Sequence, residues 1–211
     1  MLLVSTSKTK PPENRRRPYH HPNLKQALLD AAAELIAAHG PQSFTLREVA
    51  RMAGVSHNAP YRHFRDKDEL LAAVAAQGFE RLTAAMQEAA SRGKTAVERW
   101  KLSGHGYLAF ALRWPQHYFV MFDAAFEIAN HPACAAAGEA AFDALLRFVS
   151  DAQSEGRLLA GDPLPLALAS WSAVHGLAKL AINQRLPIPP AEVLKFYDDH
   201  VAAVLRRGMA A

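Results

Sequence analysis

Helix-start and helix-stop residues alternate along the chain from Asn23 to the C-terminus, and this pattern constrains the fold more than any other feature. Asn23 can cap a first helix that stops at Gly40-Pro41, and Thr45-Leu-Arg-Glu48 is a capping box. Later helices begin at prolines, which a first helical turn tolerates: Pro115, Pro132, Pro163 and Pro190. No alternating stretch longer than a few residues favours a strand. The sequence therefore predicts an all-α fold of about nine helices.

Apolar residues at helical spacing set approximate bounds for these helices. In the first part of the chain, with Ser56 as the cap of the third helix, four are expected at 23–39, 45–54, 56–64 and 66–93. Five more are expected at 95–113, 115–129, 132–155, 163–184 and 190–207. Gly104 and Gly106 fall inside one of them, where each costs about 1 kcal/mol relative to alanine, and they indicate a kink or a close helix contact.

The excess positive charge lies entirely in the first third of the chain. Residues 1–70 contain 11 Lys and Arg against 7 Asp and Glu, whereas residues 71–211 contain 13 of each. This asymmetry favours nucleic acid as a partner of the N-terminal part, with a solvated basic tail as the plain alternative. Residues 1–22 combine basic residues with prolines and lack an apolar period, so we expect a disordered basic arm there.

Composition and missing motifs argue against several classes of protein. Half of the residues are apolar, so the chain can bury a core, but no apolar run reaches the ~18 residues that cross a membrane. Cys134 is the only cysteine, which fits a reducing cytoplasm. We find no phosphate-binding glycine loop, no Glu-x-x-His pair and no zinc spacing, so we expect neither an enzyme nor a cofactor or metal. His131 and Cys134 form a lone pair that is more typical of a helix start than of a metal site.

Residues 45–64 have the pattern of two short helices that meet at a steep angle. Leu46, Val49 and Ala50 face inward at helical spacing, and Gly54 permits a left-handed backbone in the turn. Such a pair places its second helix in the major groove of DNA. A three-helix core with a basic surface is the plain alternative.

The residues expected to face solvent on the second helix all donate hydrogen bonds, and none is acidic. Side chains of this kind read base edges in the major groove; they are His57, Asn58, Arg62 and His63. Basic residues on either side could meet phosphates: Arg47, Arg51, Arg65 and Lys67. Pro60 lacks the N–H that would make a helical hydrogen bond if Ser56 were the cap, so we predict a later start or a tightened first turn.

Residues 24–80 resemble the N-terminal domain of the TetR family of bacterial transcriptional regulators. The resemblance is carried by the first helix, by "GPQSFTLREVARMAGVSHNAPYRHFRDKDELL", and above all by Tyr61-x-x-Phe64 with Lys67 and Leu70. It implies phosphate contacts at Thr45, Tyr61 and Lys67. It also implies that His57, Asn58, Arg62 and His63 lie at or near the groove. With Arg47, these residues form the expected DNA-binding set.

The segment "WSAVHGLAKL", Trp171 to Leu180, resembles the C-terminal domain of one TetR subgroup that contains Trp, His and Gly. After the basic arm at 1–22, the resemblance implies a DNA-binding domain at 23–80 and an effector-binding and dimerisation domain at 81–211. It further implies a homodimeric repressor that binds a pseudo-palindromic operator in double-stranded DNA and responds to an unknown small molecule.

Aromatic and polar residues gather between residues 100 and 175, and their polar groups suit a ligand cavity between helices. An ordinary apolar core is the plain alternative, and a lone histidine such as His175 is more often a hydrogen-bonded core residue. The cavity candidates are Trp100, His105, Tyr107, Phe110, His117, Tyr118, Met121, Phe122, Trp171 and His175.

The helix at 163–184 is apolar nearly all round, and the final helix has Leu194 and Leu205 outside its main apolar stripe, so we expect each to be buried on two sides. One side belongs to the core, and a second subunit is the economical partner for the other. The interface candidates are Ala169, Ala173, Gly176, Leu177, Leu180, Val201 and Leu205. Two rival functions stay open: a DNA-binding architectural protein without an inducer, which a filled core between residues 100 and 180 would favour, and an adaptor that has lost DNA binding.

Overall fold

A computed structural model describes residues 23–123 and 126–211, and every regular element in this part of the chain is helical. The elements are α1 (Leu24–His39), α2 (Leu46–Met52), η1 (Pro60–Arg62), α3 (Lys67–Ala90), α4 (Ala96–Arg113), α5 (Pro115–Asp123), η2 (Ile128–Asn130), α6 (Pro132–Ser154), α7 (Pro163–Ile182), η3 (Pro190–Glu192), α8 (Val193–Phe196), the π-helical turn η4 (Tyr197–Val201) and α9 (Ala202–Met209). The all-α prediction is confirmed. The basic arm expected at 1–22 lies outside the described residues.

Three helix predictions need correction. The third expected helix is only the 3-10 turn η1. The helix expected to reach residue 129 ends at Asp123, and η2 follows it as a separate turn before His131, whose φ of −128° is usual for a residue that precedes proline. The helix expected at 190–207 begins with a 3-10 turn and contains the π-helical turn η4. Because α8, η4 and α9 follow one another without a break, they act as one helix.

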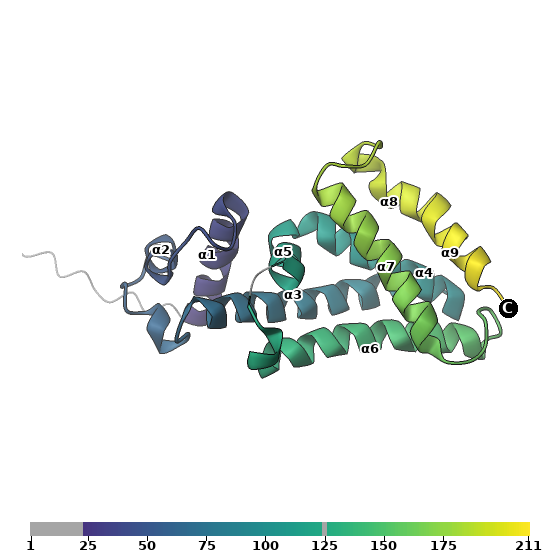
Figure 1. Cartoon of the computed structure of the whole chain (residues 1–211), viewed down its shortest axis with the longest axis horizontal. Helices are drawn as coiled ribbons and strands as arrows, with labels where there is room; N and C mark the ends of the chain where they lie inside the picture. Colours follow the sequence, from purple (N-terminus) through teal and green to yellow (C-terminus); the bar gives the residue numbers. More distant parts are fainter. Residues whose placement is uncertain (1–22, 124–125) are drawn as a thin grey trace, which may run out of the picture.

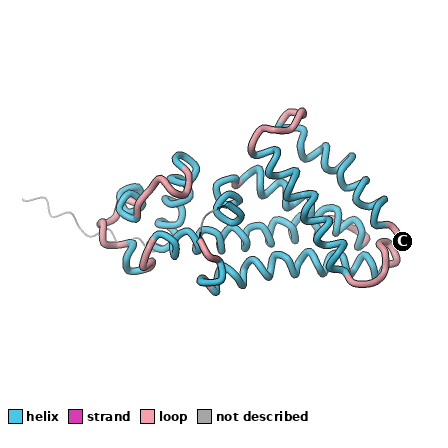
Figure 2. Tube along the Cα trace, in the orientation of Figure 1, coloured by secondary structure: helices cyan, strands magenta, loops and turns pink. Residues whose placement is uncertain are grey.

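The head of the molecule consists of α1, α2 and η1, and the long α3 leads from this head into the body (Figure 1). Within the body, α3 packs against α4, α5 and α6, while α7 packs across α4 and α6. Figure 2 shows that short loops join these helices and that α8 and α9 flank α7. Residue 80, the expected domain boundary, lies inside α3, so head and body share one continuous helix.

Local hydrogen bonds fix the helix starts that position the head. The Thr45 capping box forms as expected: the Glu48 amide donates to Oγ1 of Thr45, and the Thr45 amide donates to Oε2 of Glu48. Asp66 caps α3 by accepting from the amide of Glu69 at 2.8 Å. Gly54 has a φ of +69°, so the turn after α2 uses the left-handed backbone that glycine permits.

Gly104 and Gly106 mark close helix contacts. A Cβ at Gly106 would lie 2.4 Å from the carbonyl oxygen of Ala85, so α3 and α4 approach here as only glycine allows. A Cβ at Gly104 would lie 1.9 Å from the hydroxyl of Tyr197, which is buried and donates to the carbonyl of Lys101. Of the two explanations open at these positions, close contact is the one the structure has. Among the described helices, none is long and apolar enough to cross a membrane.

Candidate DNA-reading head and effector cavity

The second half of the helix-turn-helix begins at Pro60 and not at Ser56. Ser56 makes no side-chain cap; its carbonyl accepts from Ala59 in a turn, and η1 then covers Pro60–Arg62. The carbonyl of Pro60 accepts from both His63 and Phe64 at 2.9 Å, which closes the turn. The prediction of a later start or a tightened turn is therefore confirmed, and Ser56 as the cap is wrong, because Pro60 has no N–H to give.

The expected DNA-reading side chains lie on one exposed part of the head. His57, Asn58 and Arg62 are exposed, and the described residues offer their side chains no hydrogen bond or ion pair. Tyr61 is half exposed, and its hydroxyl has no hydrogen-bond partner among the described residues, while Phe64 three residues later is buried. The head thus turns donor groups outward on a turn that its apolar residues anchor. Thr45, Arg47 and His63 are exposed as well.

Lys67 differs from the other expected phosphate contacts because it is already bound within the head. Its Nζ donates to the carbonyl of Gln42 at 2.9 Å and lies 4.6 Å from the centroid of the Phe44 ring. Partial burial lowers the pKa of Lys67. This side chain therefore holds the loop after α1 against the start of α3.

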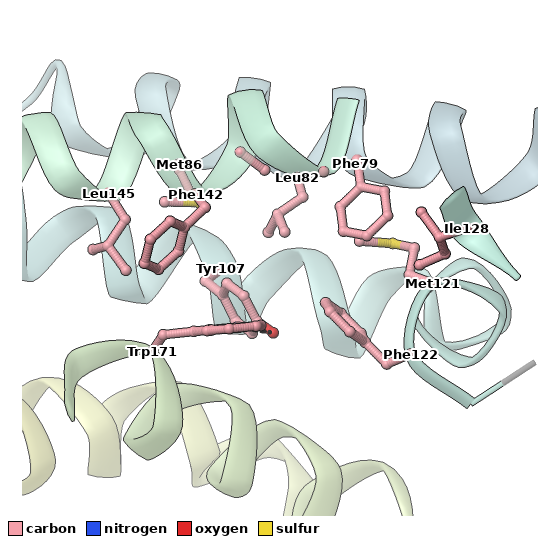
Figure 3. A pocket seen from close by; sticks show the side chains of 12 residues that line it. Phe79, Leu82, Met86, Tyr107, Met121, Phe122, Ile128, Phe142, Leu145 and Trp171 are labelled. Atoms are coloured by element: carbon pink, nitrogen blue, oxygen red, sulfur yellow. Dashed lines mark hydrogen bonds between the residues drawn. The ribbon is translucent and has the colours of Figure 1, made fainter. Parts of the chain in front are cut away.

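A cavity of about 270 Å³ lies between α3, α4, α5, α6 and α7 (Figure 3). Its walls are apolar and contain five aromatic rings and two methionines. The lining residues are Phe79, Leu82, Met86, Tyr107, Met121, Phe122, Ile128, Gly138, Ala141, Phe142, Leu145 and Trp171. Figure 3 shows Phe142 and Trp171 approaching the cavity from opposite walls, with Tyr107 behind them.

Four of the ten cavity candidates line this space: Tyr107, Met121, Phe122 and Trp171. The other six lie around it or away from it: Trp100, His105, Phe110, His117, Tyr118 and His175. The lining from α3 and α6 was missed, because apolar residues at helical spacing on a long helix look the same whether they meet a neighbour or a cavity. An aromatic residue such as Phe142 in α6 was the one feature of the sequence that could have pointed to this part of the lining.

Some of the six candidates have other partners in the body. Trp100 donates from Nε1 to the Ser170 hydroxyl at 3.1 Å, which joins α4 to α7. His105 pairs with Asp198 at 2.8 Å and so ties α4 to the π-helical turn η4. These residues support the fold around the cavity.

Tyr107, Tyr118, His175 and Trp171 form a hydrogen-bonded group at one edge of the cavity. Nδ1 of His175 lies 3.0 Å from the Tyr107 hydroxyl and 2.9 Å from that of Tyr118, and Trp171 Nε1 lies 3.4 Å from the Tyr107 hydroxyl. Burial raises the pKa of Tyr107 to about 12, and it raises that of Tyr118 further. Burial also lowers the pKa of His175, which favours its neutral form. His175 is thus a hydrogen-bonded core residue, as the plainer interpretation held.

His117 links α5 to α3 and, through α3, to the head. Its Nε2 lies 3.3 Å from both Oε1 of Gln77 and Nη1 of Arg81, while Nε2 of Gln77 donates to Gln26 on α1 at 3.0 Å. Burial, followed by the charge of Arg81, lowers the pKa of His117 to about 4. A side chain between cavity and head is therefore kept neutral.

The outer side of α7 and α9 exposes large apolar residues. Leu168 and Leu180 on α7 are more than two-fifths exposed, and Val204 on α9 is two-thirds exposed. Gly176 faces open space. Of the interface candidates, Ala169 and Leu180 are exposed, whereas Ala173, Gly176, Val201 and Leu205 are half-buried. Leu177 packs inside its own chain, so it does not belong to this outer face.

Comparison with known proteins agrees with this geometry. Residues 28–74 match the family model described as bacterial regulatory proteins, tetR family, and residues 100–204 match the model described as tetracyclin repressor-like, C-terminal domain. The chain belongs to the TetR family. This family consists of transcriptional regulators and not of enzymes.

Individual relatives extend the picture of this TetR-family chain. An HTH-type transcriptional repressor of Mycobacterium tuberculosis, Rv3405c, is 37% identical over 67 residues, which are 31% of this chain and 36% of the relative. The match thus spans about a third of that relative's length. A solved protein of unknown function from Rhodococcus sp. RHA1 is 34% identical to this chain. The match covers 93% of this chain and 100% of that protein, with a TM-score of 0.80. The regulator FadR of Bacillus subtilis, solved in complex with stearoyl-CoA, shares the fold at a TM-score of 0.73 and is 16% identical. The match covers 87% of this chain and 98% of FadR.

Proposed function

We propose that this TetR-family chain is a DNA-binding transcriptional repressor that acts in the cytoplasm as a homodimer and is released from its operator by a small molecule. The proposal rests on the head, where donor side chains that have no partner in the described part of the chain are exposed on a short turn. Family membership and the repressor among the relatives support it. An adaptor that had lost DNA binding would have no physical need for this outward set.

The exposed arginines of the head divide into two roles under this proposal. Arg62 lies on the turn that enters the groove and reads a base, whereas Arg47 on α2 meets a phosphate. Neither arginine has an ion-pair partner among the described residues. Their substitutions therefore test DNA contact with little effect on the stability of the head.

The experiment starts by selecting bound sites from random-sequence DNA, which we expect to yield an inverted repeat. Arg47→Ala then weakens binding to selected and scrambled DNA by the same factor and reduces the salt slope by about one. Arg62→Ala weakens binding to the selected site by about tenfold or more and makes the protein less selective for the base at that position. Arg147→Ala, exposed on α6 in the body, is the control and leaves both affinities unchanged. Equal effects of Arg62→Ala on all sequences would remove it from the base-reading set.

The effector part of the proposal rests on the cavity. A filled core between residues 100 and 180 would have favoured an architectural protein, but α3, α4, α5, α6 and α7 line a space of about 270 Å³. The cavity wall includes Met121 and Phe122 of α5, and the same helix reaches the head through His117 and Gln77. A ligand would release DNA only if it bound better to the form of the protein that does not fit the operator.

A further inference from the structure

We propose that the cavity takes a small, uncharged aromatic molecule of about the size of naphthalene. The inference rests on the proposed function, since it names the chemical class of the effector that the cavity would hold. It follows from four properties of the cavity: its volume, the charge of its walls, the state of its hydrogen bonds and the shape of its aromatic lining.

The volume accommodates roughly ten heavy atoms of a ligand. An apolar protein cavity of about 150 Å³ is known to hold benzene, which has six heavy atoms. The cavity here is about 270 Å³, which by simple scaling holds about eleven heavy atoms. Naphthalene fits this space. A stearoyl chain has far more carbon atoms than that, even without its coenzyme A.

The walls offer no charge to a ligand. Among the lining residues there is no Lys, Arg, His, Asp or Glu. The side-chain polar atoms are the hydroxyl of Tyr107 and Nε1 of Trp171, which lie at one edge. An ionised ligand group would lose its hydration without gaining a counter-charge, and that loss is large inside a protein. The walls therefore disfavour a carboxylate or phosphate placed inside the cavity.

The polar edge is already satisfied by the protein. Tyr107 can donate to Nδ1 of His175, Tyr118 can donate to the His175 carbonyl at 3.2 Å, and Trp171 can donate to the Tyr107 hydroxyl. The donor hydrogens of Tyr107, Tyr118 and Trp171 then each have an acceptor. Buried side-chain atoms without a partner in the described part of the chain are Nδ1 of His117 and Oδ1 of Asp198, and neither residue lines the cavity. A ligand group that accepts hydrogen bonds would have to break one of these bonds before it made its own.

The aromatic lining favours a flat ring system. Phe79 and Phe122 meet edge to face at 5.7 Å, and Phe142 and Trp171 are tilted to each other at the same centroid distance. These rings come from α3, α5, α6 and α7, so they present faces and edges from several sides (Figure 3). Met86 and Met121 add sulfur atoms that pack well against ring edges. Such walls gain more from an aromatic ligand than from a flexible chain of equal volume.

The test compares naphthalene with 1-naphthoate, which differ only by a carboxylate. Isothermal titration calorimetry and thermal unfolding followed by circular dichroism measure binding to the full chain. We expect naphthalene to bind and to raise the unfolding temperature, with 1-naphthoate at least about a hundredfold weaker. Equal binding of the two compounds, or no binding of naphthalene, would overturn the proposal.

A pair of variants at Gly138 on α6 locates the binding. A Cβ at this position would make ordinary contacts of 3.5 Å with the Phe79 ring, so Gly138→Ala leaves most of the space. Gly138→Leu places three more carbons in the cavity and should weaken naphthalene binding by about tenfold or more. Circular dichroism and binding to the selected DNA confirm that both variants fold. If Gly138→Leu binds naphthalene as the wild type does, the compound lies elsewhere and the proposal is wrong.

A DNA-release measurement separates this inference from the proposed function. If naphthalene binds in the cavity but leaves the selected DNA bound, the ligand class stands and the effector role fails. If stearoyl-CoA or 1-naphthoate releases the DNA while naphthalene does not bind, the effector role stands and the ligand class fails.

Discussion

Single residues decide how closely the helices of this protein approach. Gly104 is the sharpest case, because the Tyr197 hydroxyl occupies the place where any side chain would begin. The contact joins α4 to the π-helical turn η4, and the pair of His105 with Asp198 fastens the same two elements one residue further on. One glycine therefore controls how the last helix sits on the body.

We expect Gly104→Ala to lower the free energy of unfolding by about 1–3 kcal/mol, because the added methyl overlaps a buried ring. Gly138→Ala is the matched control: it lies in a helix with room for a Cβ and should gain up to about 1 kcal/mol from helix propensity. Urea denaturation of both variants checks the prediction. A Gly104→Ala protein as stable as the wild type would show that Tyr197 can move aside at no cost.

His117 makes stability depend on pH. It is buried on α5 and faces Gln77 and Arg81 on α3, Asp30 on α1 and the Trp114 ring. Its folded pKa of about 4 lies below the unfolded value of about 6.5, so the unfolded chain binds the proton more readily between these values. The stabilisation is therefore complete above about pH 6.5 and is lost as the pH falls toward 4, by up to about 3 kcal/mol.

Urea denaturation from pH 4 to 7 measures this dependence. We expect His117→Gln to flatten the rise of stability with pH, even though the substitution also changes packing, because only the slope reports the titration. His57→Gln, on the exposed surface of the head, should keep the wild-type slope. The same slope in all three proteins would assign the dependence to other groups.

At the scale of elements, α3 and α5 form the connection between cavity and head. Gln77 on α3 bonds both Gln26 on α1 and His117 on α5, and the ion pair of Lys179 with Asp123 holds the end of α5 to α7. A ligand that displaced Met121 and Phe122 would therefore move a helix that is bonded to both parts.

We expect Gln77→Leu to leave naphthalene affinity within about twofold and to reduce the release of DNA at saturating ligand, because both hydrogen bonds of the connection are lost. Gln87→Leu, exposed on the same helix, is the control. Calorimetry gives the ligand affinity, and fluorescence anisotropy of labelled DNA gives the release. Full release from the Gln77→Leu protein would show that the signal travels by another route.

At the scale of the whole molecule, α7 and α9 expose large apolar residues that a second subunit could cover. Large apolar residues exposed on neighbouring helices often mark an interface, and a second copy would cover them and bring two reading heads together. The heads would then lie about one DNA turn, or a multiple of it, apart.

Leu180→Asp should convert the protein to monomers and weaken operator binding, because it buries a charge in the proposed interface. Leu159→Asp is a matched control, since Leu159 is 47% exposed against 46% for Leu180 but lies in the loop before α7. Analytical ultracentrifugation measures whether each variant is a monomer or a dimer. Dimers that survive Leu180→Asp, or that are lost equally with Leu159→Asp, would rule out this face.

Much of the head and the helical fold could be predicted from the sequence, because capping boxes, helix-starting prolines and apolar spacing act over a few residues. Thr45, Asp66 and Gly54 behave as their local chemistry requires. Even the shortened second helix followed from the missing N–H of Pro60. The cavity could be predicted only as a region, since four of its ten candidates line it and the lining from α3 and α6 was missed.

The sequence by itself determined the class of fold, the place of the helix-turn-helix and the resemblance to TetR regulators, since these depend on local patterns. Only the tertiary structure decided which apolar residues face a cavity and which face a neighbour, that Lys67 is bound to Gln42, and that Gly104 makes room for Tyr197. The physical reason is distance along the chain. Helical spacing shows that a side chain faces inward, but what it meets there comes from helices tens of residues away.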